Sequence, residues 1–396
     1  MLADRAHQLL KRTQRRLLLA DYEDLRLRSK WLRDDPNAPF DLQTLAVKPD
    51  PEKVRSVLVF KPDEIGDGVY ALPAVVELRR AFPDARFSLI CHPLTAPLYE
   101  RAELFEEISP YQPGHRALPV ARRRLRDALS ELSGPPFDLA IFLRTGPATF
   151  RDFLRVPAVA RLHPLDPRLR SDSVYRAPVS TWSDNRRHMA LQLLEIVAFV
   201  TGRDYDFADV VHPPLHWRDE DGAAVDELFG GRVPQRYFVL HPFAKDETRR
   251  YPAEYWPELL DLLDPELATT WVSIGGPDDG KLPERPNLLQ AQGRLPIGAT
   301  GLLLSRASGF IGNLSGPAHL AGALGVPTAT LMSGHSLPAE WAPLGNSLVL
   351  RADVPCAPCH QRTCPVYGLA CLTSLEPRRV APELTRFFRS SLRAVS

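Results

Sequence analysis

The stretch Gly309-Phe-Ile-Gly-Asn-Leu-Ser-Gly-Pro-Ala-His319 decides the predicted fold, because a short apolar strand runs directly into a small-residue turn and then a helix. Gly312, Ser315 and Gly316 let the backbone approach an anion closely, and the N–H groups and dipole at a helix start favour a phosphate there. His319 would lie about one turn into this helix. The stretch therefore predicts a phosphate-binding turn, with an ordinary strand–helix joint as the alternative.

The bulk composition indicates a globular protein of two domains. The chain has 396 residues, of which 44% are hydrophobic and 24% charged, and its formal net charge is +1. A charge this close to zero gives no case for nucleic-acid binding. Because no apolar run approaches the ~18 residues of a membrane-spanning helix, and no signal peptide is evident, we expect a cytoplasmic protein.

A basic segment precedes the first predicted domain. Residues 1–34 combine helix-forming residues with several Arg and Lys and with leucines that could share one face. Such a helix could contact the inner face of the cytoplasmic membrane peripherally, or it could pack against its own domain or a partner.

From Val54 onward, apolar strands alternate with helices, which predicts βαβ units and parallel sheets. The expected strands are residues 57–60, 87–90, 139–142, 159–162, 237–240, 270–274, 309–311 and 328–331, and the expected helices are 69–82, 188–201, 253–263 and 377–392. The fold class is α/β, with two Rossmann-like, doubly wound domains facing a central cleft. The predicted divisions are an N-terminal helical extension at 1–50, domains at 51–215 and 216–375, and a C-terminal helix at 376–396.

Ligands of such sheets bind at the carboxyl ends of the strands, which directs attention to four loops. Asp67 follows the first strand and could serve as a helix N-cap or as a general base. The remaining candidates from these loops, predicted to bind a phosphorylated ligand through charged or polar side chains or through a glycine backbone, are Lys61, His241, Lys245, Arg249, Gly275, Asp279, Asn313, Ser315, Gly316 and His319. The chain lacks a P-loop, a spaced G-x-G-x-x-G and a G-x-S-x-G motif, which argues against a P-loop NTPase, an ordinary NAD dehydrogenase and a serine hydrolase.

Four cysteines form a local cluster of their own. Cys356, Cys359, Cys364 and Cys371 have the spacing C-x2-C-x4-C-x6-C, whose first pair resembles a zinc knuckle. A structural zinc or iron ion is one interpretation, and free thiols or a disulfide are the others. A catalytic metal is not expected there, since four thiolates would fill a tetrahedral site.

Several motifs occur together in the order typical of one family. They are Val57-Leu-Val-Phe-Lys-Pro-Asp-Glu-Ile-Gly-Asp67, Leu72-Pro-Ala74, Leu78-Arg-Arg-Ala-Phe-Pro83, Leu240-His-Pro242, Arg249-Arg-Tyr-Pro252, Gly275-Gly-Pro277, Gly312-Asn313, Ser315-Gly-Pro317, His319-Leu-Ala321, Leu324-Gly-Val-Pro-Thr328 and Cys356-Ala-Pro-Cys359. Across residues 54–375 the chain thereby resembles glycosyltransferase family nine, the heptosyltransferases of lipopolysaccharide core assembly.

The resemblance implies a GT-B fold and inverting, metal-independent transfer from a nucleotide-diphosphate sugar, with an ADP-linked donor favoured and no catalytic cofactor. Asp67 matches the family's general base, and Arg249 matches a basic residue on the donor phosphates. Ser315 and Gly316 match the phosphate-binding turn, and His319 matches the histidine that follows it. The implied acceptor is a lipopolysaccharide core, or another glycolipid or polysaccharide.

Two departures from the family pattern bear on the donor sugar. Leu314 stands where these enzymes commonly carry an aspartate, and a leucine cannot accept hydrogen bonds from sugar hydroxyls. Pro62-Asp-Glu64 replaces a common Ser-Ser. The alternatives to a transferase are therefore a GT-B nucleotide-sugar epimerase or hydrolase, and a catalytically degenerate glycan-binding member of the family.

Overall fold

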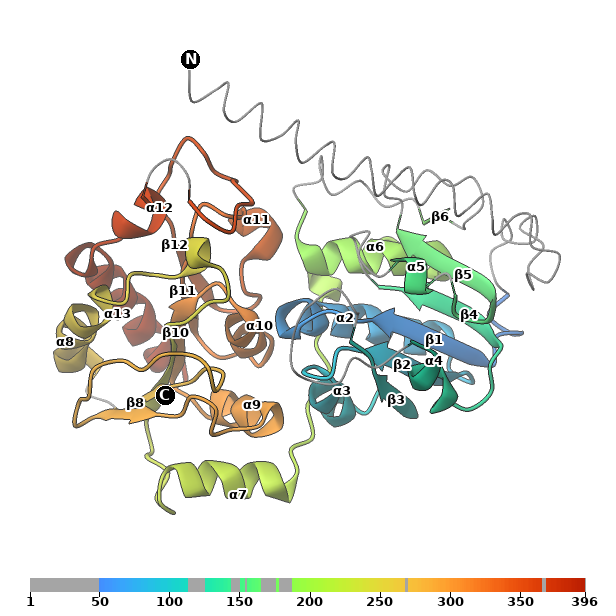
Figure 1. The fold of residues 1–396 in the computed structure, drawn as a ribbon, viewed down its shortest axis with the longest axis horizontal. Coiled ribbons are helices and arrows are strands. Elements are labelled where there is room, and N and C mark those ends of the chain that lie inside the picture. The colour runs from blue at the N-terminus through green and yellow to red at the C-terminus, as the bar shows by residue number, and fades with distance from the viewer. Residues whose placement is uncertain are drawn as a thin grey trace.

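Two sets of parallel strands, buried on both faces, organise the chain into two α/β lobes (Figure 1). The computed structural model describes residues 50–112, 125–143, 150–153, 155–164, 176–177, 187–267, 270–364 and 368–395. The predicted basic helix at residues 1–34 lies outside these residues. Within the described part of the chain, every helix is too short or too polar to cross a bilayer.

The N-terminal lobe contains the first sheet and its covering helices. Its strands are β1 (Ser56–Lys61), β2 (Arg86–Cys91), β3 (Glu107–Pro110), β4 (Phe137–Phe142), β5 (Ala158–Pro164) and β6 (Arg176–Ala177). Its helices are α2 (Ile65–Ala81), α3 (Ala96–Ala102), α4 (Leu125–Ser130), α5 (Phe150–Phe153) and α6 (Met189–Thr201). All four strands predicted for this half are confirmed, because continuous apolar runs such as residues 57–60, whose exposed fractions are 0%, suit a sheet covered on both faces.

The C-terminal lobe repeats the plan. Its strands are β7 (Tyr237–His241), β8 (Thr270–Ser273), β9 (Leu288–Gln290), β10 (Gly309–Asn313), β11 (Thr328–Leu331) and β12 (Ser347–Leu350). Its helices are α7 (Asp219–Leu228), η4 (Glu247–Arg249), α8 (Tyr255–Leu267), α9 (Ile297–Ser305), α10 (Gly316–Ala323), α11 (Pro338–Trp341), α12 (Ala370–Thr373) and α13 (Pro377–Val395). The final helix packs on α8, and its Leu384 and Phe388 join the same buried cluster as Trp271.

Both sheets have the same strand order. The first runs β3-β2-β1-β4-β5-β6, and the second, read from its other edge, runs β9-β8-β7-β10-β11-β12. In each, the chain starts at the centre, builds one side and then crosses to the other, which places the switch points between β1 and β4 and between β7 and β10. Ligands of such folds bind outside the carboxyl ends of the strands at these points.

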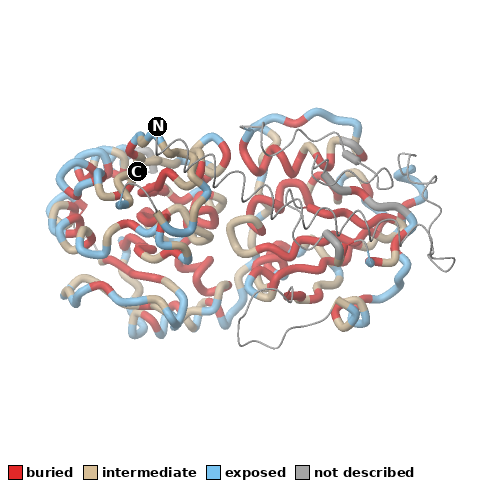
Figure 2. Tube along the Cα trace, turned by 45° about the horizontal axis from the view of Figure 1, so that its top comes forward, coloured by how far each residue is buried: buried red, intermediate tan, exposed pale blue. Residues whose placement is uncertain are grey.

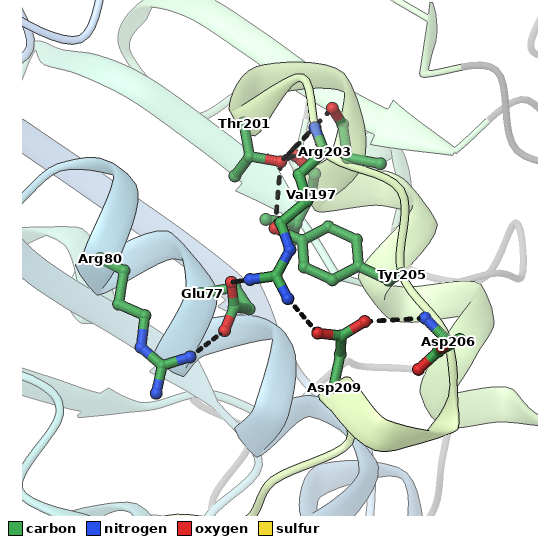
Figure 3. Close-up of polar contacts among 9 residues, drawn as sticks. Glu77, Arg80, Val197, Thr201, Arg203, Tyr205, Asp206 and Asp209 are labelled. Carbon is green, nitrogen blue, oxygen red and sulfur yellow. Dashed lines mark hydrogen bonds and ion pairs between the residues drawn. The ribbon is translucent and has the colours of Figure 1, made fainter.

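The connector between the lobes (residues 202–218, including η3, Phe207–Asp209) is anchored where it leaves α6 (Figure 3). The carboxylate of Glu77, which is 5% exposed, pairs with both Arg80 and Arg203. Arg203 also pairs with Asp209, and its guanidinium lies 5.2 Å from the centre of the Tyr205 ring. A pocket of about 570 Å³ lies beside this network, at the end of α2 remote from Asp67. The network therefore holds the start of the connector against α2.

A buried ion pair joins α7 of the C-terminal lobe to α3 of the N-terminal lobe. Arg101 of α3 donates to both carboxylate oxygens of Asp221 in α7, at 2.7 Å each, and their side chains are 5% and 0% exposed. A Cβ atom on Gly298 would lie 2.4 Å from the guanidinium, so only glycine leaves room for it. Burial alone would raise the pKa of Asp221, but hydrogen bonds from Arg101 and from the Arg218 backbone lower it. Each lobe has its own group of buried residues, drawn in red in Figure 2.

We propose residues 51–215 and 216–375 as the two domains, with α13 (in the predicted segment 376–396) docked on the second. In support, α7 packs on α9 of the C-terminal lobe, and Val225 and Leu228 of α7 belong to that lobe's core.

Replacing Asp221 by Asn should destabilise the protein by about 3–5 kcal/mol, because Arg101 would then be a buried charge whose remaining carboxylate neighbour, Glu220, is exposed and 3.9 Å away. Glu220→Gln is the matched control, since Glu220 is 68% exposed and lies 3.9 Å from the same guanidinium. Urea unfolding of the full chain measures both. Equal midpoints for the two variants would contradict a stabilising role for the buried pair.

Candidate active site

The starts of α2 and α10 meet where the two lobes face each other (Figure 1). A Cβ atom on Gly66 would lie 2.6 Å from Cδ2 of His319, and one on Gly316 would lie 2.9 Å from Cβ of Ile65. Each helix directly follows a strand at a switch point. Asp67 in α2 and the Ser315-Gly316 turn are thus brought to one region of the interface.

Asp67 does not occupy the N-cap position, so the cap interpretation of this residue was wrong. The helix begins at Ile65, earlier than the predicted start at residue 69, and its N-cap is Glu64, with an extended backbone and no capping bond from its side chain. Asp67 lies in the first turn and is half-buried. After burial, its charge is the second cause of the raised pKa of Tyr70.

Lys61 lies on the N-terminal lobe, apart from the other predicted donor ligands. Its side chain is 2% exposed, and its Nζ lies 2.8 Å from Asp63 in the turn that leads to α2. Its charge is therefore directed into this turn.

His319 joins the two lobes through uncharged groups. Its Nδ1 lies 2.6 Å from the hydroxyl of Tyr70, and this hydroxyl lies 2.9 Å from the Ala342 carbonyl. His188 Nε2 donates to the same carbonyl at 2.8 Å, while its Nδ1 accepts from the N–H of Ala190. Burial, helped by His188 and Arg249, lowers the pKa of His319 to about 3. Tyr70, His188 and His319 thus form a neutral cluster that connects the two lobes beside the candidate site.

His241 and Ser315 connect the two central strands of the C-terminal sheet. His241 is the last residue of β7, and its Nδ1 lies 2.9 Å from Oγ of Ser315, the residue before α10. Burial lowers the pKa of His241 to about 4, although Asp279 opposes this. Leu314, next to Ser315, is half-buried.

Two predicted donor ligands, Asn313 and Asp279, also hold the loops of the site in shape. Asn313 is fully buried, its Oδ1 accepts from the Tyr251 N–H at 2.8 Å, and its Nδ2 donates to the Phe243 carbonyl at 3.1 Å. Asp279 accepts from the Gly276 N–H at 2.7 Å. The same carboxylate would lie 2.7 Å from a Cβ atom on Gly275. The side chains of Asn313 and Asp279 are therefore committed to backbone groups.

The cationic side chains gather over the C-terminal lobe. Lys245 pairs at 2.7 Å with Glu64 of the opposite lobe. Arg249 has a 40% exposed side chain, with Nε 3.8 Å from Asp246 and Nη2 3.2 Å from Nε2 of His335. Residues that the sequence analysis missed, His335, His360 and Arg362, lie near Arg249, as the effects of Arg249, His360 and Arg362 on the pKa of His335 indicate. His335 follows β11, so it could have been predicted from the tendency of ligands to bind at the carboxyl ends of parallel strands.

The four cysteines predicted as zinc or iron ligands lie near one another in the segment after β12, since the other three thiols affect the pKa of Cys356. None forms a disulfide, and among the described residues no group of three or more His, Cys, Asp or Glu side chains could hold a metal ion. The loop is held by other contacts: the Leu369 N–H donates to Sγ of Cys364 at 3.4 Å, and the Cys359 N–H donates to the Gly334 carbonyl at 2.9 Å. Burial, followed by the neighbouring thiols, raises the pKa of Cys356. These positions therefore hold thiols and not disulfides.

Comparison with known proteins agrees with this arrangement. The profile of glycosyltransferase family 9 (heptosyltransferase) matches residues 166–370. Lipopolysaccharide heptosyltransferase 1 of Pseudomonas aeruginosa is 26% identical over 376 residues, covering 83% of this chain and 96% of that protein.

Solved structures of similar fold cover most of the chain. The ADP-heptose lipopolysaccharide heptosyltransferase II of E. coli has a TM-score of 0.65 at 18% identity, covering 85% of this chain and 99% of its own. The family 9 glycosyl transferase of Veillonella parvula has a TM-score of 0.68 at 18% identity, with coverage of 87% and 99%. The E. coli heptosyltransferase WaaC, solved with ADP-2-deoxy-2-fluoro heptose, has a TM-score of 0.59 at 16% identity, with coverage of 84% and 99%.

The fold is therefore GT-B, and the protein is a glycosyltransferase. The chain belongs to glycosyltransferase family 9, the heptosyltransferase family.

Lowering the pH should destabilise the protein through its buried neutral histidines. In the unfolded chain the pKa of His319 returns to about 6.5, whereas in the folded protein it is about 3. The unfolded state therefore binds the extra proton, so stability is highest above pH 6.5 and falls as the pH drops toward 3.

For His319 alone, we expect a loss of about 2 kcal/mol between pH 7 and pH 5. His319→Asn retains a neutral group near Tyr70 but cannot titrate, so its stability should fall less over this interval. Urea unfolding at both pH values measures the difference. Identical pH slopes for the wild type and the variant would rule out this role of His319.

Proposed function

We propose that the protein is an inverting, metal-independent glycosyltransferase that moves a heptose or a related sugar from an ADP-linked donor to a lipopolysaccharide core or another surface-glycan acceptor. The observation that carries the proposal is the approach of the Asp67 turn of α2 to the Ser315-Gly316 turn of α10 across the two lobes. The acceptor domain would be the N-terminal one, and the donor domain the C-terminal one.

The proposed reaction is a direct displacement. Asp67 takes the proton of an acceptor hydroxyl. As it does so, the hydroxyl oxygen of the acceptor attacks the anomeric carbon of the donor on the face opposite the leaving group. The bond between that carbon and the diphosphate oxygen breaks, and the configuration inverts. A half-buried carboxylate at the helix start suits this role, since its position is fixed by the backbone.

The leaving diphosphate needs positive charge and N–H donors on the other side. Arg249, with its 40% exposed side chain, and the N-terminal N–H groups of the eight-residue helix α10 supply both. Ser315, held by His241, offers a hydroxyl at the same turn. Because these groups carry the charge stabilisation, we propose no catalytic cofactor.

We carry the donor and the acceptor over to this chain from the names of the similar proteins. The Pseudomonas aeruginosa relative is a lipopolysaccharide heptosyltransferase, and WaaC was solved with an ADP-linked heptose analogue. A glycolipid acceptor places the reaction at the cytoplasmic face of the membrane, where the basic residues 1–34 would make a peripheral contact.

Leu314 is the observation that supports a second candidate function. This apolar side chain beside Ser315 would leave sugar hydroxyls without a partner, so a different donor sugar, action on the donor alone, or binding without turnover are the alternatives. Incubation with a panel of nucleotide sugars, with and without a glycolipid acceptor, separates them. Turnover only with acceptor supports transfer, donor conversion alone supports an epimerase or hydrolase, and binding alone supports a degenerate member.

Asp67→Asn should lower kcat for transfer by at least about 100-fold, because an amide cannot take the hydroxyl proton. Donor affinity should stay within about twofold, since the donor phosphates contact the other lobe. Asp84→Asn is the control, a carboxylate of the same lobe that is 82% exposed and pairs only with Arg55 at 3.5 Å among the described contacts. Steady-state kinetics with calorimetric donor binding tests both, and near-normal transfer by Asp67→Asn would remove this residue from the base role.

A further inference from the structure

The loop after β11 brings a histidine into contact with the proposed phosphate-binding arginine. Nη2 of Arg249 lies 3.2 Å from Nε2 of His335, and Nδ1 of His335 lies 2.7 Å from Oγ of Ser336. The Arg249 loop is also tied to the segment after β12, since Thr248 Oγ1 donates to the Gln361 carbonyl at 2.5 Å, and the His360 N–H of that segment donates to the His335 carbonyl at 3.1 Å. The histidine is therefore held by Ser336 of its own loop, while its Nε2 contacts the arginine.

The contact determines which nitrogen of His335 carries the proton. A guanidinium can only donate, so Nε2 must accept with its lone pair, and the proton resides on Nδ1, facing Ser336. The charges around the ring agree with a neutral imidazole: burial, then Arg249, His360 and Arg362, lower the pKa of His335 to about 3. The ring is thus an uncharged acceptor throughout the physiological pH range.

Arg249 is held on two sides and open on the rest. Its Nε lies 3.8 Å from Asp246, which is shared with Arg362 at 3.8 Å, and Nη2 contacts His335. Its side chain nevertheless remains 40% exposed. A cation that is oriented by fixed partners and still accessible is prepared for an incoming anion.

We propose that His335 is a positioning residue that orients the Arg249 guanidinium toward the donor diphosphate, an inference that rests on the proposed function. The choice of an imidazole has a physical reason. A carboxylate in this place would also orient the arginine, but it would cancel the charge that a diphosphate needs. A neutral acceptor fixes the geometry and leaves the charge available.

The test uses ADP alone as the probe, with affinities measured by titration calorimetry on the full chain. His335→Ala should weaken ADP binding about tenfold, the size of a lost hydrogen bond to a charged group. His335→Gln can place Oε1 near the position of Nε2 and should stay within about threefold of the wild type. His335→Glu has the same shape as the glutamine but a negative charge, and should bind ADP about tenfold more weakly than His335→Gln.

The Gln and Glu variants separate positioning from a merely structural role, because a structural role would not distinguish two side chains of equal shape by their charge. Arg249→Ala should weaken ADP binding strongly, and adding His335→Ala to it should cause no further loss. Independent, multiplying effects in the double variant, or a glutamine variant as weak as the alanine one, would overturn the inference.

Failure of the proposed function gives a different pattern. A wild type that binds neither ADP nor GDP nor UDP would overturn the nucleotide-sugar assignment, and this inference with it. Normal ADP binding that depends on Arg249 but not on His335 would overturn only the role of His335. Thermal unfolding of each variant identifies any that is not folded, and the glutamine–glutamate comparison decides the case if the alanine variant is among them.

Discussion

The close approach of α2 and α10 is the constraint on which the rest of the structure depends. Each helix follows a strand at the switch point of its sheet, so the contact between the helix starts sets how far apart the two switch points lie. Gly66 and Gly316 permit this approach, since a side chain at either would collide with His319 or Ile65. Around this contact, Tyr70, with its partners across the interface, and the buried Arg101–Asp221 pair keep the lobes in register.

The interface also separates charge by lobe. On one side Glu64 and Asp67 lie at the start of α2, after the mutually paired Lys61 and Asp63, whereas arginines and histidines cluster beyond β7 and β11 on the other. Between them lie groups that are polar but neutral, because burial lowers the pKa of His188 and His319. Sugar transfer needs this separation, with a proton acceptor beside the nucleophile and positive charge beside the leaving group. The neutral groups join the lobes without neutralising the carboxylates on one side or the cations on the other.

The sequence was informative where a single physical requirement governs a segment. Strands such as residues 57–60 were predicted because a doubly covered strand must be apolar along its whole length. The start of α2 was missed, since Ile65 and Gly66 are weak helix formers and are held in the helix by packing against α10. The commitment of Asn313 to two backbone groups and the partner of His335 depend on loops that meet only in the folded chain. The cysteine spacing likewise predicted that the four thiols lie close together, and their mutual effects on the pKa values of Cys356 and Cys371 agree with this.

The exposed pair between Lys245 and Glu64 crosses the same interface but contributes differently. Its side chains are 62% and 39% exposed, and such pairs contribute about 0–1 kcal/mol and weaken as salt screens them. The contacts that hold the lobes together are instead buried or uncharged. Ionic strength should therefore affect the binding of an anionic ligand more than it affects the packing of the two lobes. Added salt would release Lys245 and weaken the hold on an anionic ligand, while the relative placement of the lobes would persist.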